Sequence, residues 1–249
     1  MAWILGIGVL LLMLVLLRFG QVSDYLYAQW VKDPPRTPPV GRVIVAPADG
    51  TVLYVKPFEN GLLPEIVKRG VPVPVHEHLK RIEPLSQVHG YLIGIYMSTH
   101  GVHLNRVPLS GEVEQITVFN GPHMSMTRAE VRIILGQLIP GWVSLKKWLG
   151  LAPFDIENQA DYILKSARES LTIADVRGAR VHVTRIADYS VGKILTWVQE
   201  GEAVTTGQKL GMITWGSQTD LLIEGSPGLE IRVSPGDRVL GGESVLATY

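Results

Sequence analysis

The chain has 249 residues, which is enough for one large domain or two small ones with a buried core. Its 23 basic and 23 acidic side chains cancel, so no nucleic-acid partner is expected, and the absence of cysteine excludes disulfide frameworks, thiol catalysis and every cysteine-ligated zinc or iron–sulfur site. Charged residues make up only 18% of the sequence, which indicates that part of the chain contacts something other than water.

Residues 1–31 are predicted to form an N-terminal transmembrane helix that acts as a membrane anchor. No charged residue occurs from Ala2 to Leu17, and the apolar stretch approaches the roughly 20 residues that span a bilayer. The sequence has neither a basic n-region nor a cleavage site, so the anchor is expected to be retained. Because Arg18 and Lys32 follow the span and no side-chain charge precedes it, the body is predicted to face the cytoplasm at the cell membrane. A buried N-terminal core helix is the alternative interpretation.

Residues 32–42 are rich in proline and are predicted to form a stiff linker to a domain over 43–249. In that domain, short β-rich runs alternate with glycine turns, which predicts a mainly β fold of the β-rich α+β kind. The clearest predicted strands are Val43–Val45, Thr51–Val55, Tyr91–Tyr96, Gly111–Ile116 and Arg180–Ile186. Between Met124 and Leu171 the periodicity changes. Residues 142–148 form a short amphipathic segment there, which suits either contact with the membrane interface or packing on the domain.

The C-terminal part contains an internal repeat, in which Val198–Leu210 aligns with Val233–Val245 at an offset of 35 residues. Both copies follow the pattern V-x-x-G-acid-x-V-x-x-G-polar-x-aliphatic, and each predicts a strand, a glycine turn, a second strand and another turn. Two such units related by pseudo-symmetry resemble the flattened barrel of biotinyl/lipoyl-type domains, the barrel-sandwich hybrid. This pattern predicts a lipoyl-like core and says little about activity.

Three short motifs carry residues that could do chemistry, and each also has an ordinary structural explanation. Asp49 begins an Asp-Gly turn, and Gly216-Ser217 is an equally common turn dipeptide. His100 and His103 are three residues apart and could bind metal, transfer protons or simply be satisfied by neighbours in the fold.

Taken together, the three motifs resemble the phosphatidylserine decarboxylase family. An Asp-Gly turn is followed by a paired-His strand and then by Gly-Ser within a lipoyl-like barrel, and the similarity is strongest over 46–50, 100–111 and 191–220. The stretch Glu157-Asn158-Gln159 is similar to one found between these blocks in the family. The compact length resembles the short branch, which includes archaetidylserine decarboxylases, and Gln218 departs from the Gly-Ser-Thr of the long branch.

The resemblance implies an enzyme that is made as an inactive chain and then cuts itself. The cut would fall between Gly216 and Ser217, giving a β chain of residues 1–216 and an α chain of residues 217–249 that stay associated. Ser217 would become an N-terminal pyruvoyl group, the self-made cofactor that forms a Schiff base with the substrate amine and accepts electrons when phosphatidylserine or archaetidylserine loses CO2.

The resemblance also implies roles for individual side chains. Ser217 would be the nucleophile, His103 its base and Asp49 the group that orients the imidazole, by analogy with a Ser-His-Asp arrangement. His103 is the first candidate for the acid that protonates the product, and His100 is the second. No metal is implied. The expected partners are a phospholipid substrate and the membrane, and a homo-oligomer is compatible with the sequence.

Two other classes of protein fit parts of the sequence. A non-enzymatic membrane-anchored adaptor also combines one N-terminal span with a lipoyl-like barrel, and it would not need Ser217. A zinc hydrolase could use His76, His78 and the His100/His103 pair as ligands. However, His76-Glu77-His78 lies in a Pro-rich polar stretch and is expected to be a solvated loop.

Overall fold

The structure is a computed structural model that describes residues 28–29, 31–68, 71–80, 88–97, 101–121, 167–187, 194–213 and 217–249. The described part is mainly β, which confirms the predicted class. It contains no helix long and apolar enough to cross a membrane. Nearly all of the predicted anchor, and the amphipathic segment 142–148, lie outside the described residues.

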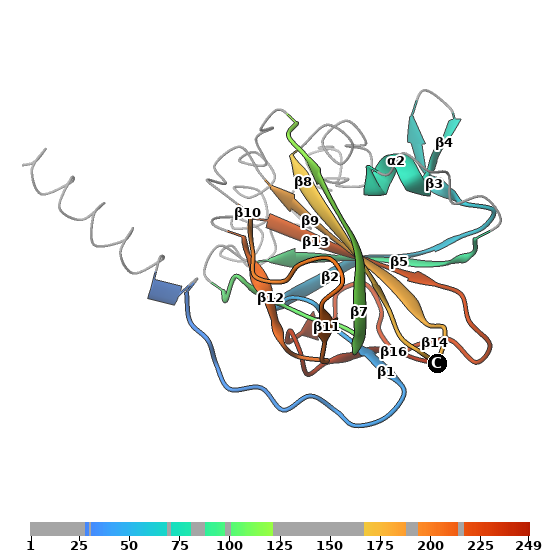
Figure 1. The fold of residues 1–249 in the computed structure, drawn as a ribbon. Coiled ribbons are helices and arrows are strands. Elements are labelled where there is room, and N and C mark those ends of the chain that lie inside the picture. The colour runs from blue at the N-terminus through green and yellow to red at the C-terminus, as the bar shows by residue number, and fades with distance from the viewer. Residues whose placement is uncertain are drawn as a thin grey trace, which may run out of the picture.

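A central antiparallel sheet has the strand order β11-β7-β8-β9-β13-β5-β2-β15 (Figure 1). Its strands are β2 (Gly50–Phe58), β5 (Gly90–Met97), β7 (Gly111–Phe119), β8 (Arg168–Ala174), β9 (Arg180–Ala187), β11 (Ala203–Val204), β13 (Ser217–Glu224) and β15 (Arg238–Val239). The strand β13 pairs with β5 on one side and with β9 on the other, so it is held in the middle of the sheet.

Two three-stranded sheets and a hairpin complete the described fold. One sheet has the order β1 (Val43–Val45), β16 (Val245–Thr248), β14 (Glu230–Ile231), and the other has the order β10 (Ile194–Thr196), β12 (Lys209–Ile213), β6 (Leu104–Arg106). The hairpin β3 (Leu62–Lys68) and β4 (Val71–Pro74) leads into the helix α2 (Val75–Leu79), at the upper right of Figure 1. Each predicted strand is present. The strand β8, which begins inside the region of changed periodicity, was not predicted.

The sequence repeat corresponds to two matching structural units. We call residues 42–52 with 230–249 half A, and residues 103–113 with 195–213 half B. In half B the N–H of Gly201 donates to the Val113 carbonyl, and in half A the N–H of Gly236 donates to the Val52 carbonyl, both at 2.8 Å. The φ angles of these two glycines are +80° and +99°, a region that glycine enters without steric cost.

The offset between the halves changes within the second turn. It is 35 residues as far as the second glycine of each copy, but Leu210 corresponds to Leu246 rather than to Val245. The N–H of Trp197 donates to the Leu210 carbonyl (3.0 Å), as that of Arg232 donates to the Leu246 carbonyl (2.8 Å). The predicted alignment is therefore wrong by one residue at its last position, because the turn of half A is one residue longer.

Both faces of β13 are buried. Leu221 and Ile223 belong to the main apolar core, whereas Leu222 packs with Val75 and Leu79 of α2 in a second cluster. The strand β13 is therefore held in place by packing on both faces as well as by two strand neighbours.

Candidate functional site

The Asp-Gly turn and the Gly-Ser motif lie at the same end of the central sheet. Ser217 is the first residue of β13 and is paired with Met97, the last residue of β5. On the other side of β5, Thr51 is paired with Tyr96, so Asp49 lies just beyond this edge. Two strand spacings separate the backbones of β13 and β2, about 10 Å.

The chain brings His103 to the same place. The N–H of Ile213, the last residue of β12, donates to the carbonyl of His103 at 3.2 Å. Ser217 follows Ile213 by four residues, and His103 follows Met97 by six. Met97 is paired with Ser217, and His103 is hydrogen-bonded to Ile213. The segment from Met97 to His103 and the segment from Ile213 to Ser217 therefore connect the same two places in the fold.

One side-chain contact joins the two motifs directly. The amide of Asn105 donates to Thr219 Oγ1 at 3.3 Å, and both side chains are fully buried. Asn105 follows His103 by two residues and Thr219 follows Ser217 by two, so this contact joins the chain close to both predicted site residues. The other amide atom, Asn105 Oδ1, has no hydrogen-bond partner among the described residues.

The imidazole of His103 is held in a defined protonation state. Its Nδ1 lies 3.0 Å from the carbonyl of Gly101, and because a carbonyl only accepts, Nδ1 carries the proton in this hydrogen bond. Burial lowers the pKa of His103 to about 4, although the hydrogen bond to Gly101 acts in the opposite direction. At neutral pH the ring is therefore uncharged, with Nε2 as the basic nitrogen.

The carboxylate of Asp49 binds other partners. Its Oδ2 accepts a hydrogen bond from Arg36 at 2.6 Å, and its Oδ1 accepts one from the N–H of Gly241 at 2.7 Å. Within the described residues, none of its hydrogen bonds reaches His103. A hydrogen bond to the Gly101 carbonyl helps to orient His103 in this structure. Two further predicted site residues, His100 and Gly216, lie outside the described residues.

A buried polar cluster on the other face of β13 was missed by the sequence analysis. The Asp220 carboxylate accepts hydrogen bonds from the Tyr54 hydroxyl (2.9 Å) and the Gln218 amide (2.7 Å), and His78 Nε2 lies 3.0 Å from its Oδ2. Burial, and then the Asp220 charge, raise the pKa of Tyr54 well above its ordinary value, so this hydroxyl remains a donor. The four consecutive polar residues at the start of β13, Ser217–Asp220, were the available signal.

The prediction of a solvated loop at His76-Glu77-His78 is wrong. These residues lie in α2, and His78 is fully buried against Asp220. The apolar neighbours Val75 and Leu79 explain the difference, because they fix one side of this short helix against the sheet. The described residues contain no group of three or more His, Asp or Glu that could hold a metal ion.

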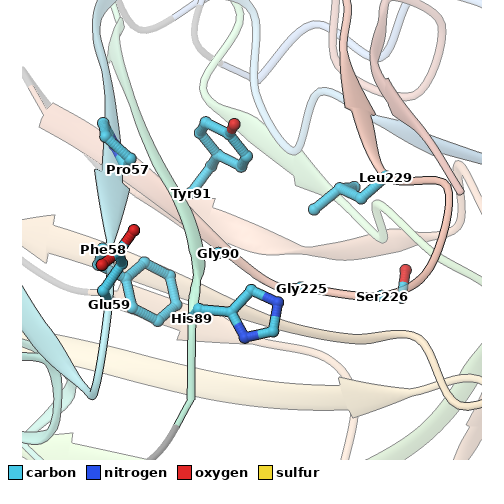
Figure 2. Close-up of a pocket in the computed structure, with 9 residues that line it drawn as sticks. All are labelled: Pro57, Phe58, Glu59, His89, Gly90, Tyr91, Gly225, Ser226 and Leu229. Atoms are coloured by element: carbon cyan, nitrogen blue, oxygen red, sulfur yellow. The ribbon is translucent and has the colours of Figure 1, made fainter.

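An open pocket of about 200 Å³ lies at the opposite end of the sheet (Figure 2). Its lining includes Glu59, His89, Gly90 and Ser226. Gly90 and Met97 are seven positions apart along β5, which corresponds to about 23 Å along the strand. This pocket is therefore remote from the position of Ser217.

Comparisons with known proteins agree with one another. The family described as Phosphatidylserine decarboxylase matches residues 26–247. A protein of Methanocaldococcus jannaschii, provisionally named archaetidylserine decarboxylase proenzyme, is 30% identical over 87% of this chain and 86% of its own length. A protein of Methanothermobacter thermautotrophicus with the same provisional name is 29% identical over 89% of this chain and 79% of its own length. The phosphatidylserine decarboxylase proenzyme of Pelobacter propionicus is 28% identical over 86% of this chain and 73% of its own length.

Proposed function

Because this chain belongs to the phosphatidylserine decarboxylase family, we propose that it cuts itself between Gly216 and Ser217 and then removes CO2 from the serine headgroup of a phospholipid. The chain is a carboxy-lyase of that family. Its product is the corresponding ethanolamine phospholipid, with either diacyl or archaeal ether chains.

The hydrogen bond between Asn105 and Thr219 is the observation that carries the proposal. It fixes the strand of His103 against the strand of Ser217 with both side chains buried. A serine hydroxyl is a weak nucleophile that needs a neighbouring base, and an uncharged imidazole with Nε2 as its basic nitrogen is suited to that role.

Self-cleavage then follows a balanced sequence of steps. His103 accepts the hydroxyl proton as Ser217 Oγ attacks the Gly216 carbonyl, and the peptide bond is exchanged for an ester. Elimination removes the Cα proton of Ser217 and breaks its Cβ–O bond, which forms a carbon–carbon double bond and releases the carboxylate of Gly216. Water then converts the remaining enamine to a keto group, with loss of ammonia, so that a pyruvoyl group begins the new chain.

The sheet explains how the two chains would stay together. After a cut before Ser217, the C-terminal fragment still contributes β13 to the centre of the main sheet, between β5 and β9. It also contributes β16, which pairs with β1. Separation would break these backbone ladders and expose the apolar core, so the fragments should remain associated.

The residues near the cut also fit a pyruvoyl enzyme. When present, the pyruvoyl carbonyl supplies an electron sink for breaking a carbon–carbon bond. Asn105 Oδ1, buried and without a described partner, is an acceptor suited to a substrate amine. His103 can return a proton to the carbon that loses CO2, a contribution of typically about 10²- to 10⁴-fold.

We further propose that halves A and B form a lipoyl-like barrel-sandwich hybrid, supported by their matching hydrogen bonds. Residues 1–31 would anchor this body to the cytoplasmic face of the cell membrane, close to the lipid substrate. Charge asymmetry around the apolar stretch supports this orientation. Added protease should digest the body in inverted vesicles, and protection there would contradict the orientation.

The direct test uses the two Gly-Ser dipeptides of the chain. Ser217→Ala should remain uncut and inactive, because it lacks the nucleophile and the precursor of the pyruvoyl group. The matched control Ser226→Ala alters the Gly-Ser at the remote pocket and should be cut and active like wild type. Mass spectrometry should find a fragment from position 217 to Tyr249 with a blocked N-terminus. An active preparation that contains only the full-length chain would refute the proposal.

A further inference from the structure

The proline-rich segment before β1 is bound to the body. We call residues 33–38 the strap, which Figure 1 shows in blue leading towards β1. On half B, Arg106 donates hydrogen bonds to the Asp33 carboxylate (2.6 Å) and to the Pro34 carbonyl (3.1 Å). A Cβ atom added to Gly207 would lie 2.4 Å from Pro38, so the strap touches this turn as well.

The strap also binds half A, at the predicted orienting residue. Arg36 donates to Asp49 (2.6 Å) and, through its other terminal nitrogen, to Glu243 (3.3 Å). The N–H of Thr37 donates to the same Glu243 carboxylate at 2.8 Å. The side chains of Arg36 and Asp49 are only 8% and 17% exposed, so this charge-assisted hydrogen bond is less screened than a surface ion pair.

Half B shows what Asp49 adds to the barrel. The position equivalent to Asp49 is Ser110, whose hydroxyl accepts a hydrogen bond from the N–H of Thr206 at 2.8 Å. This matches the bond from Gly241 to Asp49 Oδ1. A hydroxyl group is therefore sufficient to accept the hydrogen bond from the opposite turn in this fold. The second carboxylate oxygen is the feature peculiar to Asp49, and Arg36 binds it.

Two of the three sequence motifs thus meet through the strap. Asp49 belongs to the motif 46–50 and Arg106 to the motif 100–111, and the strap binds both within four residues of chain. Rigid placement of a catalytic group generally depends on such supporting contacts.

We propose that Arg36 is a positioning residue for self-cleavage, which acts through Asp49 to fix the Asp-Gly turn beside the cleavage site. This inference rests on the proposed function. It also means that the strap, which leads from the expected anchor, contributes a residue to the self-cleavage site of the domain.

The test measures how fast the fragment beginning at position 217 appears in the full chain. Arg36→Gln should slow cleavage about tenfold or more, the scale of one charge-assisted hydrogen bond, whereas Arg36→Lys should stay within about threefold of wild type. Glu243→Gln is the matched control, because it weakens the other arm of Arg36 without touching Asp49, and it should cleave within about threefold of wild type. Added guanidinium should partly restore cleavage in Arg36→Ala, which a purely structural defect would not permit.

A double-mutant comparison separates this inference from the proposed function. Asp49→Ser keeps the tie to Gly241 but removes the oxygen bound by Arg36, so it should be slow, and adding Arg36→Gln should slow it no further. The inference would be overturned if Arg36→Gln cleaved like wild type, or if the losses in Arg36→Gln and Asp49→Ser were additive in the double mutant. It would also be overturned if cleavage stayed slow both in Arg36→Lys and in Arg36→Ala with added guanidinium. None of these results would affect the Ser217→Ala test, whose failure alone would remove the proposed function.

Discussion

Halves A and B share a backbone pattern but differ in the side chains that matter for chemistry. The N–H of Ile213 donates to the His103 carbonyl in half B, and the N–H of Tyr249 donates to the Arg42 carbonyl in half A, both at 3.2 Å. His103 and Arg42 therefore occupy equivalent positions. The imidazole of His103 is fully buried, whereas the exposed Arg42 guanidinium lies 5.1 Å from the centre of the Tyr249 ring.

The second difference lies at the turns, where Asp49 in half A corresponds to Ser110 in half B. The fold is satisfied by either side chain, since both accept the equivalent N–H. At positions where the two matching halves differ in this way, the backbone fold does not require one particular side chain. The proposed base and its proposed orienter both occupy such positions, one in each half.

Of the substitutions that test this difference between the halves, removal of the His103 imidazole should have the largest effect on self-cleavage. His103→Ala is expected to slow self-cleavage about 10²- to 10⁴-fold, because it removes the proposed base for the Ser217 hydroxyl. Arg42→Ala, at the equivalent position of half A, should cleave within about twofold of wild type. The rates are measured by gel or mass spectrometry on freshly synthesised chain. Equal effects of the two substitutions would mean that the position serves the barrel and not the chemistry.

The pKa of His103 predicts an effect on stability that half A lacks. The folded value of about 4 lies below the ordinary value of 6.5, so the unfolded chain binds a proton that the folded chain does not. The contribution of neutral His103 to stability is fully present above pH 6.5 and is lost as the pH falls to 4. It amounts to about 3 kcal/mol.

Urea unfolding over this pH range measures the effect, with Ser217→Ala as the background so that a single uncut chain unfolds. Adding His103→Gln should flatten the dependence of the unfolding free energy on pH, and adding Arg42→Ala should not. An unchanged slope in the His103 variant would show that the imidazole is not held neutral by burial.

The strands and the repeat could be predicted because their signals are local. The β-rich run Arg180–Ile186 predicts a strand from residue types alone, without knowledge of the partner strands. Glycines at fixed positions in the repeat, such as Gly201 and Gly236, predict the turns because a positive φ is costly for other residues.

The features that were missed depend on partners distant in the sequence. His78 is buried against Asp220, which lies far along the chain. In the same way, a Pro-rich run containing Arg36 predicts an extended linker, and nothing local indicates that Asp49 and Glu243 bind it. The proposed roles of His103 and Asp49 came from resemblance to a family, and their hydrogen-bond partners came only from the folded chain.

The smallest expected effect tests the claim that the two halves are equivalent in energy as well as in geometry. Gly201 and Gly236 both have a positive φ, and a Cβ atom added to either would meet nothing within 4 Å. Substitution by alanine should therefore cost only the backbone strain, about 1–2 kcal/mol at each position, and asparagine should cost less. Urea unfolding of the uncut Ser217→Ala chain measures both costs. Similar unfolding costs at Gly201 and Gly236, with normal self-cleavage when the same substitutions are made in the chain that keeps Ser217, would mean that the two halves differ in function through their side chains. A cost at one glycine that exceeds the other by several kcal/mol would instead place it in the backbone of that half.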